Sequence, residues 1–125
     1  MANIMVVDDD RGALKLIEIM LSGGGFVVVT ALNGETALQK LDQETPDLII
    51  LDIMMPGMSG IELCAKIRQR EQTTQTPILI LSTRSDSTAV LSSVDNGATD
   101  YMPKPVIRNE LVSKVNQLLS MNAVT

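Results

Sequence analysis

The sequence predicts an α/β domain in which helices cover both faces of a doubly wound parallel sheet of five strands. Two observations support this fold class. Short apolar runs alternate along the chain with amphipathic stretches of helical spacing. The runs are continuously apolar, which is typical of strands buried on both faces of a parallel sheet. At 125 residues, the chain is long enough for one domain with one good core.

Five apolar runs, each bounded by Gly, Pro, Asn or Asp, are predicted to be strands. The run near the carboxyl end of the chain is the weakest of them. In order, the runs are Asn3–Val7, Phe26–Thr30, Asp47–Leu51, Pro77–Leu81 and Thr99–Met102.

Each predicted strand is followed by a stretch with apolar residues at helical spacing. The first helix is expected to stop at Gly23–Gly25, which follow a helix and therefore do not form a phosphate loop. A capping box of Ser59 and Glu62 opens the third helix. The five stretches are Ala13–Leu21, Asn33–Leu41, Ser59–Ile67, a fourth from Ser85 or Asp86 to Asn96-Gly97, and Ile107–Leu119. The domain is therefore expected to span residues 1–120, with 121–125 as a tail.

Five βα units in succession imply right-handed crossovers. For a domain of this size, the predicted strand order is 2-1-3-4-5, the flavodoxin-like (βα)5 order. Such sheets bind ligands outside the carboxyl ends of the strands, where the first and third strands lie side by side. Asp8, Asp9 and Asp52 follow those two strands, so three carboxylates are predicted at this edge. Asp10 is expected to cap the next helix instead.

Three carboxylates within a few ångströms raise one another's pKa unless a cation lies among them. Mg²⁺ prefers oxygen ligands and commonly serves phosphate chemistry. The fourth strand runs into Ser82, and Lys104 comes just after the fifth. A hydroxyl and an ammonium group suit phosphoryl oxygens. The whole set fits a carboxylate nucleophile that forms an acyl phosphate.

The composition excludes several classes of function. The chain has no histidine and one cysteine, Cys64, which excludes Ser–His–Asp triads, internal disulfides and the usual zinc sites. The net charge of −5 disfavours direct binding to nucleic acid. No apolar run approaches the roughly 20 residues of a membrane span, and the first residues do not resemble a signal peptide. We therefore expect a cytoplasmic location, with no direct membrane or nucleic-acid contact.

From about Ala2 to Leu119, the chain resembles the receiver domain of two-component response regulators, and in particular the single-receiver chemotaxis regulators. The matching segments are VVDDD at 6–10, LIILDIMMPGMSG at 48–60, PILILS at 77–82 and GATDYMPKP at 97–105. The spacings of 30 residues from Asp52 to Ser82 and 22 residues from there to Lys104 also fit.

The resemblance implies a role for each matching position. Asp52 would accept a phosphoryl group. Asp9 directly, and Asp8 mainly through water, would hold Mg²⁺ or Mn²⁺ together with Asp52 and the backbone carbonyl of Met54. Lys104 would pair with the phosphoryl group.

The resemblance also implies a switch. Ser82 would close onto a phosphoryl oxygen, and Tyr101 would turn inward as that loop moves. Lys104-Pro105 would be a cis peptide, which only X-Pro bonds adopt at low cost. The surface formed by the fourth helix, fifth strand and fifth helix, roughly Asp86–Leu119, would carry the output.

Three positions depart from the family or vary within it. Thr83 stands where the family often has Ala or Gly, and its larger side chain is expected to narrow access to Asp52. Met54 and Arg84 occupy positions that tune dephosphorylation. Neither has a carboxylate or amide to orient an attacking water, so self-hydrolysis is expected to be slow.

The implied partners are a sensor histidine kinase or phosphotransfer protein and an unidentified output partner or attached domain, with a phosphorylation-dependent dimer as one form of output. Two other functions stay open. One is a constitutive interaction module with a silent site. The other is a Mg²⁺-dependent phosphohydrolase with Asp52 as nucleophile. Haloacid-dehalogenase-like hydrolases carry a second Asp two residues after the nucleophile, and Met54 at that position disfavours turnover.

Overall fold

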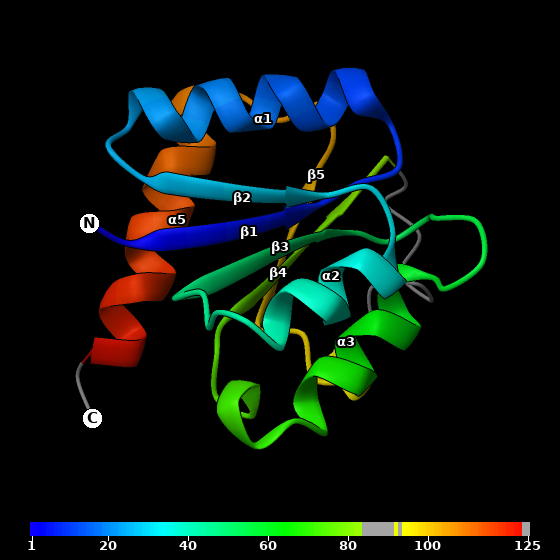
Figure 1. The fold of residues 1–125 in the computed structure, drawn as a ribbon. Helices are drawn as coiled ribbons and strands as arrows, with labels where there is room; N and C mark the ends of the chain where they lie inside the picture. The colour runs from blue at the N-terminus through cyan, green and yellow to red at the C-terminus, as the bar shows by residue number, and fades with distance from the viewer. Residues whose placement is uncertain (84–91, 93, 124–125) are drawn as a thin grey trace.

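A single parallel sheet of five strands forms the centre of the molecule (Figure 1). The computed structural model describes residues 1–83, 92 and 94–123. The strand order is β2-β1-β3-β4-β5, which confirms the predicted fold. The strands are β1 (Asn3–Val7), β2 (Val27–Ala31), β3 (Leu48–Asp52), β4 (Ile78–Ser82) and β5 (Asp100–Pro103).

The last four strands each begin and end one residue later than predicted. The cause is visible in the register of the sheet, where Asp52 pairs with Leu81 and Ser82 pairs with Pro103. The polar residues that follow the apolar runs are therefore still part of the strands. This shift holds their side chains on the rigid sheet rather than on flexible loops.

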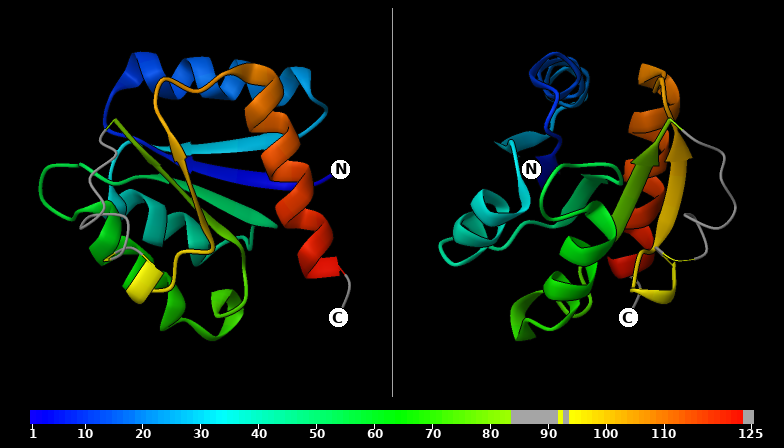
Figure 2. Two further views of the ribbon diagram at one scale, coloured as in Figure 1. Left: turned by 180° about the vertical axis from the view of Figure 1, so that it is seen from behind. Right: turned by 90° about the vertical axis from the view of Figure 1, so that its right-hand side faces the viewer.

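Among the helices given bounds in the described part of the chain, two pack on each face of the sheet (Figure 2). Helices α1 (Arg11–Gly23) and α5 (Arg108–Ala123) lie on one face, and α2 (Gly34–Leu41) and α3 (Gly60–Arg68) lie on the other. A short 3₁₀ helix, η1 (Glu71–Thr73), follows α3.

One predicted helix start lies outside the described residues, and one predicted helix end is wrong. Ser85 and Asp86, where the fourth helix was expected to start, lie outside the described residues, whereas residues 92, 94 and 95 near its expected end are helical. Helix α5 continues to Ala123, beyond the predicted end at Leu119. The segment expected as a tail is thus helical over its first three residues. Among the helices of the described residues, none is long and apolar enough to cross a membrane.

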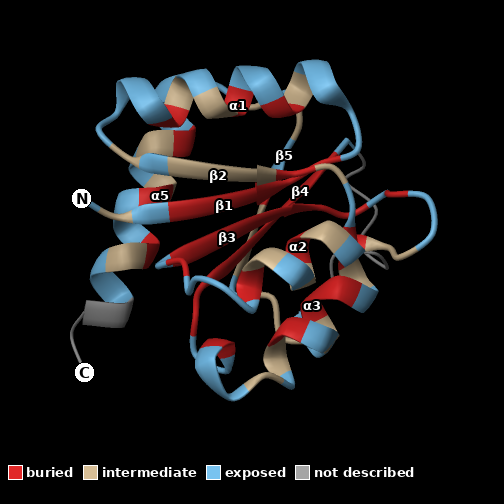
Figure 3. Ribbon diagram, viewed as in Figure 1, coloured by how far each residue is buried: buried red, intermediate tan, exposed pale blue. Residues whose placement is uncertain are grey.

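Alternating side chains of the strands build a core on each face. In β1, Ile4 and Val6 join the core beneath α1 and α5, whereas Met5 and Val7 join the core beneath α2 and α3. Strands β3 and β4 are buried along their whole length (Figure 3). Burial on both faces explains why these strands are continuously apolar rather than alternating. Cys64 is fully buried in the core beneath α2 and α3.

The predicted caps fix where three helices begin. The carboxylate of Asp10 accepts hydrogen bonds from the first backbone N–H groups of α1, at 2.9 and 3.2 Å. Asn33 caps α2 and Ser59 caps α3 in the same way. At the other end of α1, Gly25 has a φ of 91°, which permits the chain to turn into β2. Asp10 is therefore occupied by its helix, as expected.

The loop after β3 returns to the strand through Gly60. The Gly60 backbone N–H donates to the carbonyl of Ile53 at 3.0 Å. A Cβ atom at Gly60 would lie only 2.2 Å from the carbonyl oxygen of Asp52 and 2.8 Å from Cα of Ile53. Only glycine therefore lets α3 begin this close to the end of β3.

We expect Gly60→Ala to lower the free energy of unfolding by about 2–3 kcal/mol, because the new methyl group overlaps backbone that cannot move aside without displacing a strand. Urea unfolding measures this change. Gly12→Ala is the matched control, since Gly12 lies in the first turn of α1 and a Cβ there meets only Asp10 Oδ1, at 3.3 Å. Equal stability of the two variants would contradict this assignment.

The start of α5 has no side-chain cap of the usual kind. The carbonyl of Ile107 accepts the first helical hydrogen bond, from the N–H of Leu111 at 2.9 Å, so an apolar side chain occupies the N-cap position. Ile107 is 57% exposed. We expect Ile107→Ser to raise the free energy of unfolding by about 1 kcal/mol relative to Ile107→Ala. Equal urea midpoints for the two variants would show that the cap is already satisfied.

Candidate functional site

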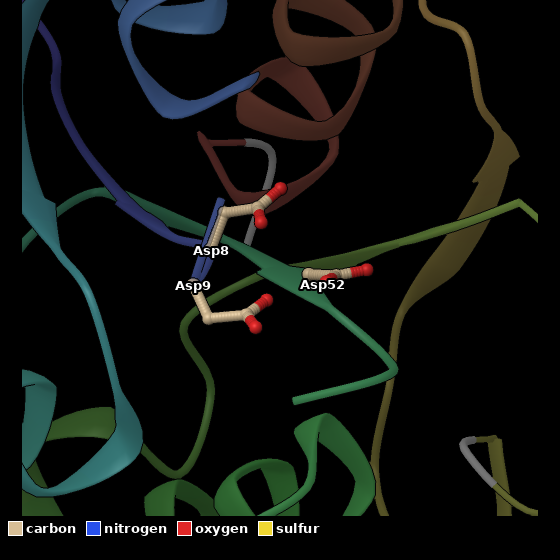
Figure 4. A group of neighbouring side chains, drawn as sticks. All are labelled: Asp8, Asp9 and Asp52. Carbon is tan, nitrogen blue, oxygen red and sulfur yellow. The ribbon is translucent and has the colours of Figure 1, made fainter. Parts of the chain in front are cut away.

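Three carboxylates converge at the carboxyl ends of β1 and β3, as the strand order predicted (Figure 4). One oxygen from each of Asp8, Asp9 and Asp52 lies within 4.8 Å of the other two. They meet because β1 and β3 are neighbours, with Val7 paired to Leu51. Asp8 and Asp52 are buried, whereas Asp9 is exposed. The group therefore forms a partly enclosed site that opens to solvent on the side of Asp9.

Lys104 lies against two of these carboxylates. Its Nζ is 2.7 Å from Asp8 Oδ2 and 3.4 Å from Asp52 Oδ1. The backbone N–H of Lys104 donates to the carbonyl of Ser82 at 2.8 Å, so the end of β5 is tied to the end of β4. The Lys104-Pro105 peptide is cis. Among the described residues, Lys104 is thus the one cation in ion-pair contact with this group, and it contacts two of the three carboxylates.

The pKa of the Asp52 carboxyl group is raised, because the positive charge of Lys104 does not fully offset burial and the charge of Asp8. Burial is the main influence and raises the pKa of Asp52, and the negative charge of Asp8 raises it further. Contact with Lys104 opposes this effect, but the pKa of Asp52 remains above its usual value. Ionising Asp52 is therefore less favourable in this site than in water, and a further cation beside it would favour the ionised form.

Lys104 is in the opposite situation. Burial lowers the pKa of Lys104, but its hydrogen bond to Asp8 and the charges of Asp52 and Asp8 together raise it above the usual lysine value. The ammonium group therefore stays charged at neutral pH. It is held in place as the positive charge of the site.

The remaining predicted residues surround this cluster. Ser82 is buried at the end of β4, and Tyr101 is half-buried in β5. Thr83 is exposed. The Met54 side chain is 61% exposed, while its backbone N–H donates to Asp52. Arg84 lies outside the described residues.

A cavity of about 320 Å³ opens beside Lys104, between α1 and the segment that joins β5 to α5. The sequence reasoning did not identify this cavity, because its wall combines residues from three distant parts of the chain. One indication in the sequence is Leu16, an apolar residue of α1 that does not share the helix face of Leu14, Ile17 and Leu21. In the structure, Leu16 is 52% exposed. The cavity is lined by Asp10, Ala13, Leu16, Ile17, Thr83, Lys104, Pro105 and Val106.

The fold and the acidic cluster together define a class of protein, namely α/β domains that carry a group of carboxylates at the edge of a parallel sheet. The chain belongs to the family described as response regulator receiver domain, whose sequence profile matches residues 4–116. Receiver domains are signalling domains rather than enzymes that turn over a substrate, and they bind Mg²⁺ in general.

Similar proteins agree with this assignment. The phosphate regulon transcriptional regulatory protein PhoB of Rhizobium meliloti (strain 1021) is 40% identical over 116 residues, which are 93% of this chain and 51% of that protein. The chain thus spans about half the length of several curated relatives that it matches.

Two solved structures show the same fold. A putative response regulator from Chloroflexus aurantiacus is 37% identical, with a TM-score of 0.91 over 95% of this chain and 98% of that one. The BeF3-activated DrrB receiver domain is 35% identical, with a TM-score of 0.86 over 96% of this chain and 98% of that one.

The raised pKa of Asp52 makes the free energy of unfolding depend on pH. The unfolded chain ionises this carboxyl near its ordinary value of 3.8, whereas the folded domain holds the proton to higher pH. The folded state therefore loses stability as the pH rises through this interval, and the loss persists at neutral pH. We expect Asp52→Asn to raise the melting temperature at pH 7, because the amide carries no charge.

The measurement is thermal unfolding of the two proteins from pH 4 to pH 7. The stabilisation by Asn should grow as the pH rises through this range. An Asp52→Asn variant that is less stable than the wild type at pH 7 would show that contact with Lys104 outweighs burial.

Proposed function

We propose that this domain is a phosphorylation-controlled switch that accepts a phosphoryl group on Asp52 from a sensor histidine kinase or a phosphotransfer protein. One observation carries the proposal: Asp52 is a buried carboxylate that lies both 3.4 Å from Lys104 and within 4.8 Å of the oxygens of Asp8 and Asp9. Membership in the receiver family supports the same function.

The donor set fits a hard divalent cation. The three side chains offer only oxygen atoms at close spacing, and the chain has no histidine to favour zinc. Asp8, Asp9 and Asp52, with the backbone carbonyl of Met54, would hold Mg²⁺, and Mn²⁺ shares this preference for oxygen. When bound, the ion supplies positive charge to the phosphoryl oxygens during transfer.

The position of Asp52 supports the following reaction. One of its oxygens attacks the phosphorus of the donor's phosphohistidine, and an O–P bond forms as the N–P bond breaks. The imidazole nitrogen of the donor keeps the electron pair, and Asp52 becomes an acyl phosphate. Lys104 is already within reach of Asp52 and pairs with the charge on the incoming phosphoryl group.

Transmission of the signal begins at Ser82. Its hydroxyl donates to a phosphoryl oxygen, which draws the segment after β4 toward Asp52. Because the end of β4 is bonded to β5 at Lys104, Tyr101 on β5 responds by turning inward. The surface over residues 86–119, of which residues 86–91 and 93 lie outside the described part of the chain, then presents a changed face to the output partner, to an attached domain or to a second phosphorylated copy. The phosphoryl group shifts the population only by as much as it prefers this state.

The names of several relatives support a proposal about the output of this domain. Several of them are named as transcriptional regulators, and one as DNA-binding, so the output of this domain is expected through a partner or attached domain rather than by its own contact with nucleic acid. A cytoplasmic location is proposed, where the kinase presents its phosphohistidine.

Three positions set the lifetime of the phosphoryl group. Thr83 is one of the residues that line the cavity beside Lys104, and its side chain, larger than Ala or Gly, is expected to narrow access to Asp52. The Met54 side chain is exposed and has no group that can activate water. Arg84, in the third of these positions, likewise has no carboxylate or amide. We therefore expect slow self-hydrolysis, with a half-life of minutes or longer when the phosphorylated domain is followed by intact mass. A half-life of seconds would contradict this expectation.

We expect one phosphoryl group to appear on the wild-type domain after incubation with a small phosphodonor and Mg²⁺, as measured by intact mass. The adduct should require Mg²⁺, should be absent from Asp52→Asn and should be released by hydroxylamine. Asp47→Asn is a matched control at an exposed acid outside the site.

Two outcomes would overturn the proposal. Catalytic consumption of the donor without an adduct would favour a Mg²⁺-dependent phosphohydrolase. Neither adduct nor consumption, with kinase as well as small donor, would favour a constitutive interaction module.

A further inference from the structure

The guanidinium of Arg68, at the end of α3, makes four hydrogen bonds at the opposite end of the sheet from the acidic site. Its Nε donates to the carbonyl of Gly97 at 2.9 Å, and its Nη1 donates to the carbonyls of Thr73 and Thr76 at 2.9 and 2.6 Å. Its Nη2 donates to the hydroxyl of Thr99 at 3.3 Å. Among the described residues, its hydrogen-bond partners are all uncharged.

The guanidinium of Arg68 is partly buried and is held by uncharged acceptors alone among the described residues. Burial lowers the pKa of Arg68, because it disfavours the charged form of the guanidinium. The protein stabilises this charge with carbonyl dipoles instead of a carboxylate. The bonds satisfy the planar fork of the guanidinium from three directions. Lysine has a single ammonium group on a flexible stem and cannot reproduce this geometry.

The four partners lie just before two strands. Thr73 and Thr76 precede β4, whereas Gly97 and Thr99 precede β5. The two strand starts are also bonded to each other, because the Thr99 hydroxyl accepts from the N–H of Ile78 at 2.9 Å and the Thr99 N–H donates to the Ile78 carbonyl at 2.8 Å. Arg68 therefore holds the beginnings of β4 and β5 together.

Gly97 gives Arg68 the room that it needs. Its φ is 104°, and a Cβ atom there would lie 2.5 Å from Cγ of Arg68. Both the backbone conformation and the close approach of the arginine stem require glycine at this position. The contact between Arg68 and the segment before β5 thus depends on glycine at position 97 as well as on the arginine.

The same two strands end at the functional site. Strand β4 ends in Ser82, and Lys104 follows β5 and bonds to Ser82 through its backbone. Figure 2 shows β4 and β5 running side by side from the level of the α3 end upward. Tyr101 lies between the end held by Arg68 and the end that carries the site.

We infer that Arg68 is a positioning residue for the switch. It fixes the starts of β4 and β5, so that displacement at Ser82 changes the position of Tyr101 relative to the sheet instead of shifting both strands together. This inference rests on the proposed function, since it concerns how the phosphoryl signal reaches Tyr101.

The experiment uses the single tyrosine of a chain without tryptophan, because its intrinsic fluorescence reports Tyr101 alone. The fluorescence change on adding Mg²⁺ and beryllofluoride is measured for the wild type, Arg68→Lys and Arg70→Lys. Arg70 is the matched control, since it pairs with Asp42 on the surface. Phosphoryl uptake by Asp52 is measured in parallel by intact mass.

We expect Arg68→Lys to take up phosphoryl as the wild type does, while its Tyr101 response falls by about twofold or more. Arg70→Lys should match the wild type in both measurements. Thr99→Val keeps the side-chain shape but removes the hydroxyl that Arg68 and Ile78 share, so it should weaken the response in the same way and serves if Arg68→Lys does not fold.

A full Tyr101 response in a folded Arg68→Lys or Thr99→Val variant, accompanied only by a lower melting temperature, would overturn the inference and leave Arg68 a structural role. A phosphorylated wild type without any Tyr101 response would instead refute the proposed switch at Tyr101, and with it the inference. The two failures are therefore distinguished by the wild type alone.

Discussion

The close approach of three carboxylates, balanced by one lysine, is the interaction on which the rest of this structure depends. Asp8, Asp9 and Asp52 meet within 4.8 Å only because β1 and β3 are adjacent. Lys104 reaches them only because β5 ends on the same side of the sheet and is bonded to β4. The doubly wound order brings these distant segments together. The buried apolar strands then hold them there against their mutual repulsion.

The site is charged in a way that favours function over stability. Lys104 offsets part of the charge of Asp8 and Asp52, but burial still keeps the pKa of Asp52 above its usual value. A fold selected only for stability would replace one of these acids. Their retention leaves an unmet demand for positive charge, which is what a cation-dependent phosphoryl site requires. The apolar core and the charged site are therefore parts of one arrangement.

Local rules made most of the fold predictable. Continuous apolar runs indicated buried strands, and Asp10, Asn33 and Ser59 indicated helix starts, because each of these signals depends on a few neighbouring residues. The convergence of the acids followed once the strand order was assumed. The strand ends were wrong by one residue because Asp52 and Ser82 still pair in the sheet.

Other features depend on contacts between distant segments and could not be read from the sequence. The preference of Lys104 for Asp8 over Asp52 reflects the path of the chain after β5. The four bonds of Arg68 reach carbonyls and a hydroxyl as far as 31 residues away, and nothing near Arg68 in the sequence indicates them. The cavity beside Lys104 combines three segments in the same way.

The most direct measurement is the Mg²⁺ affinity of the wild type and of Lys104→Met by isothermal titration calorimetry. Lys104 now supplies the positive charge among these carboxylates, so its removal leaves Asp8 and Asp52 with more negative charge to satisfy. If the acids form a cation site balanced by this lysine, the variant will bind Mg²⁺ severalfold more tightly than the wild type. Equal or weaker binding by a folded variant would show that Lys104 does not balance the charge of this site.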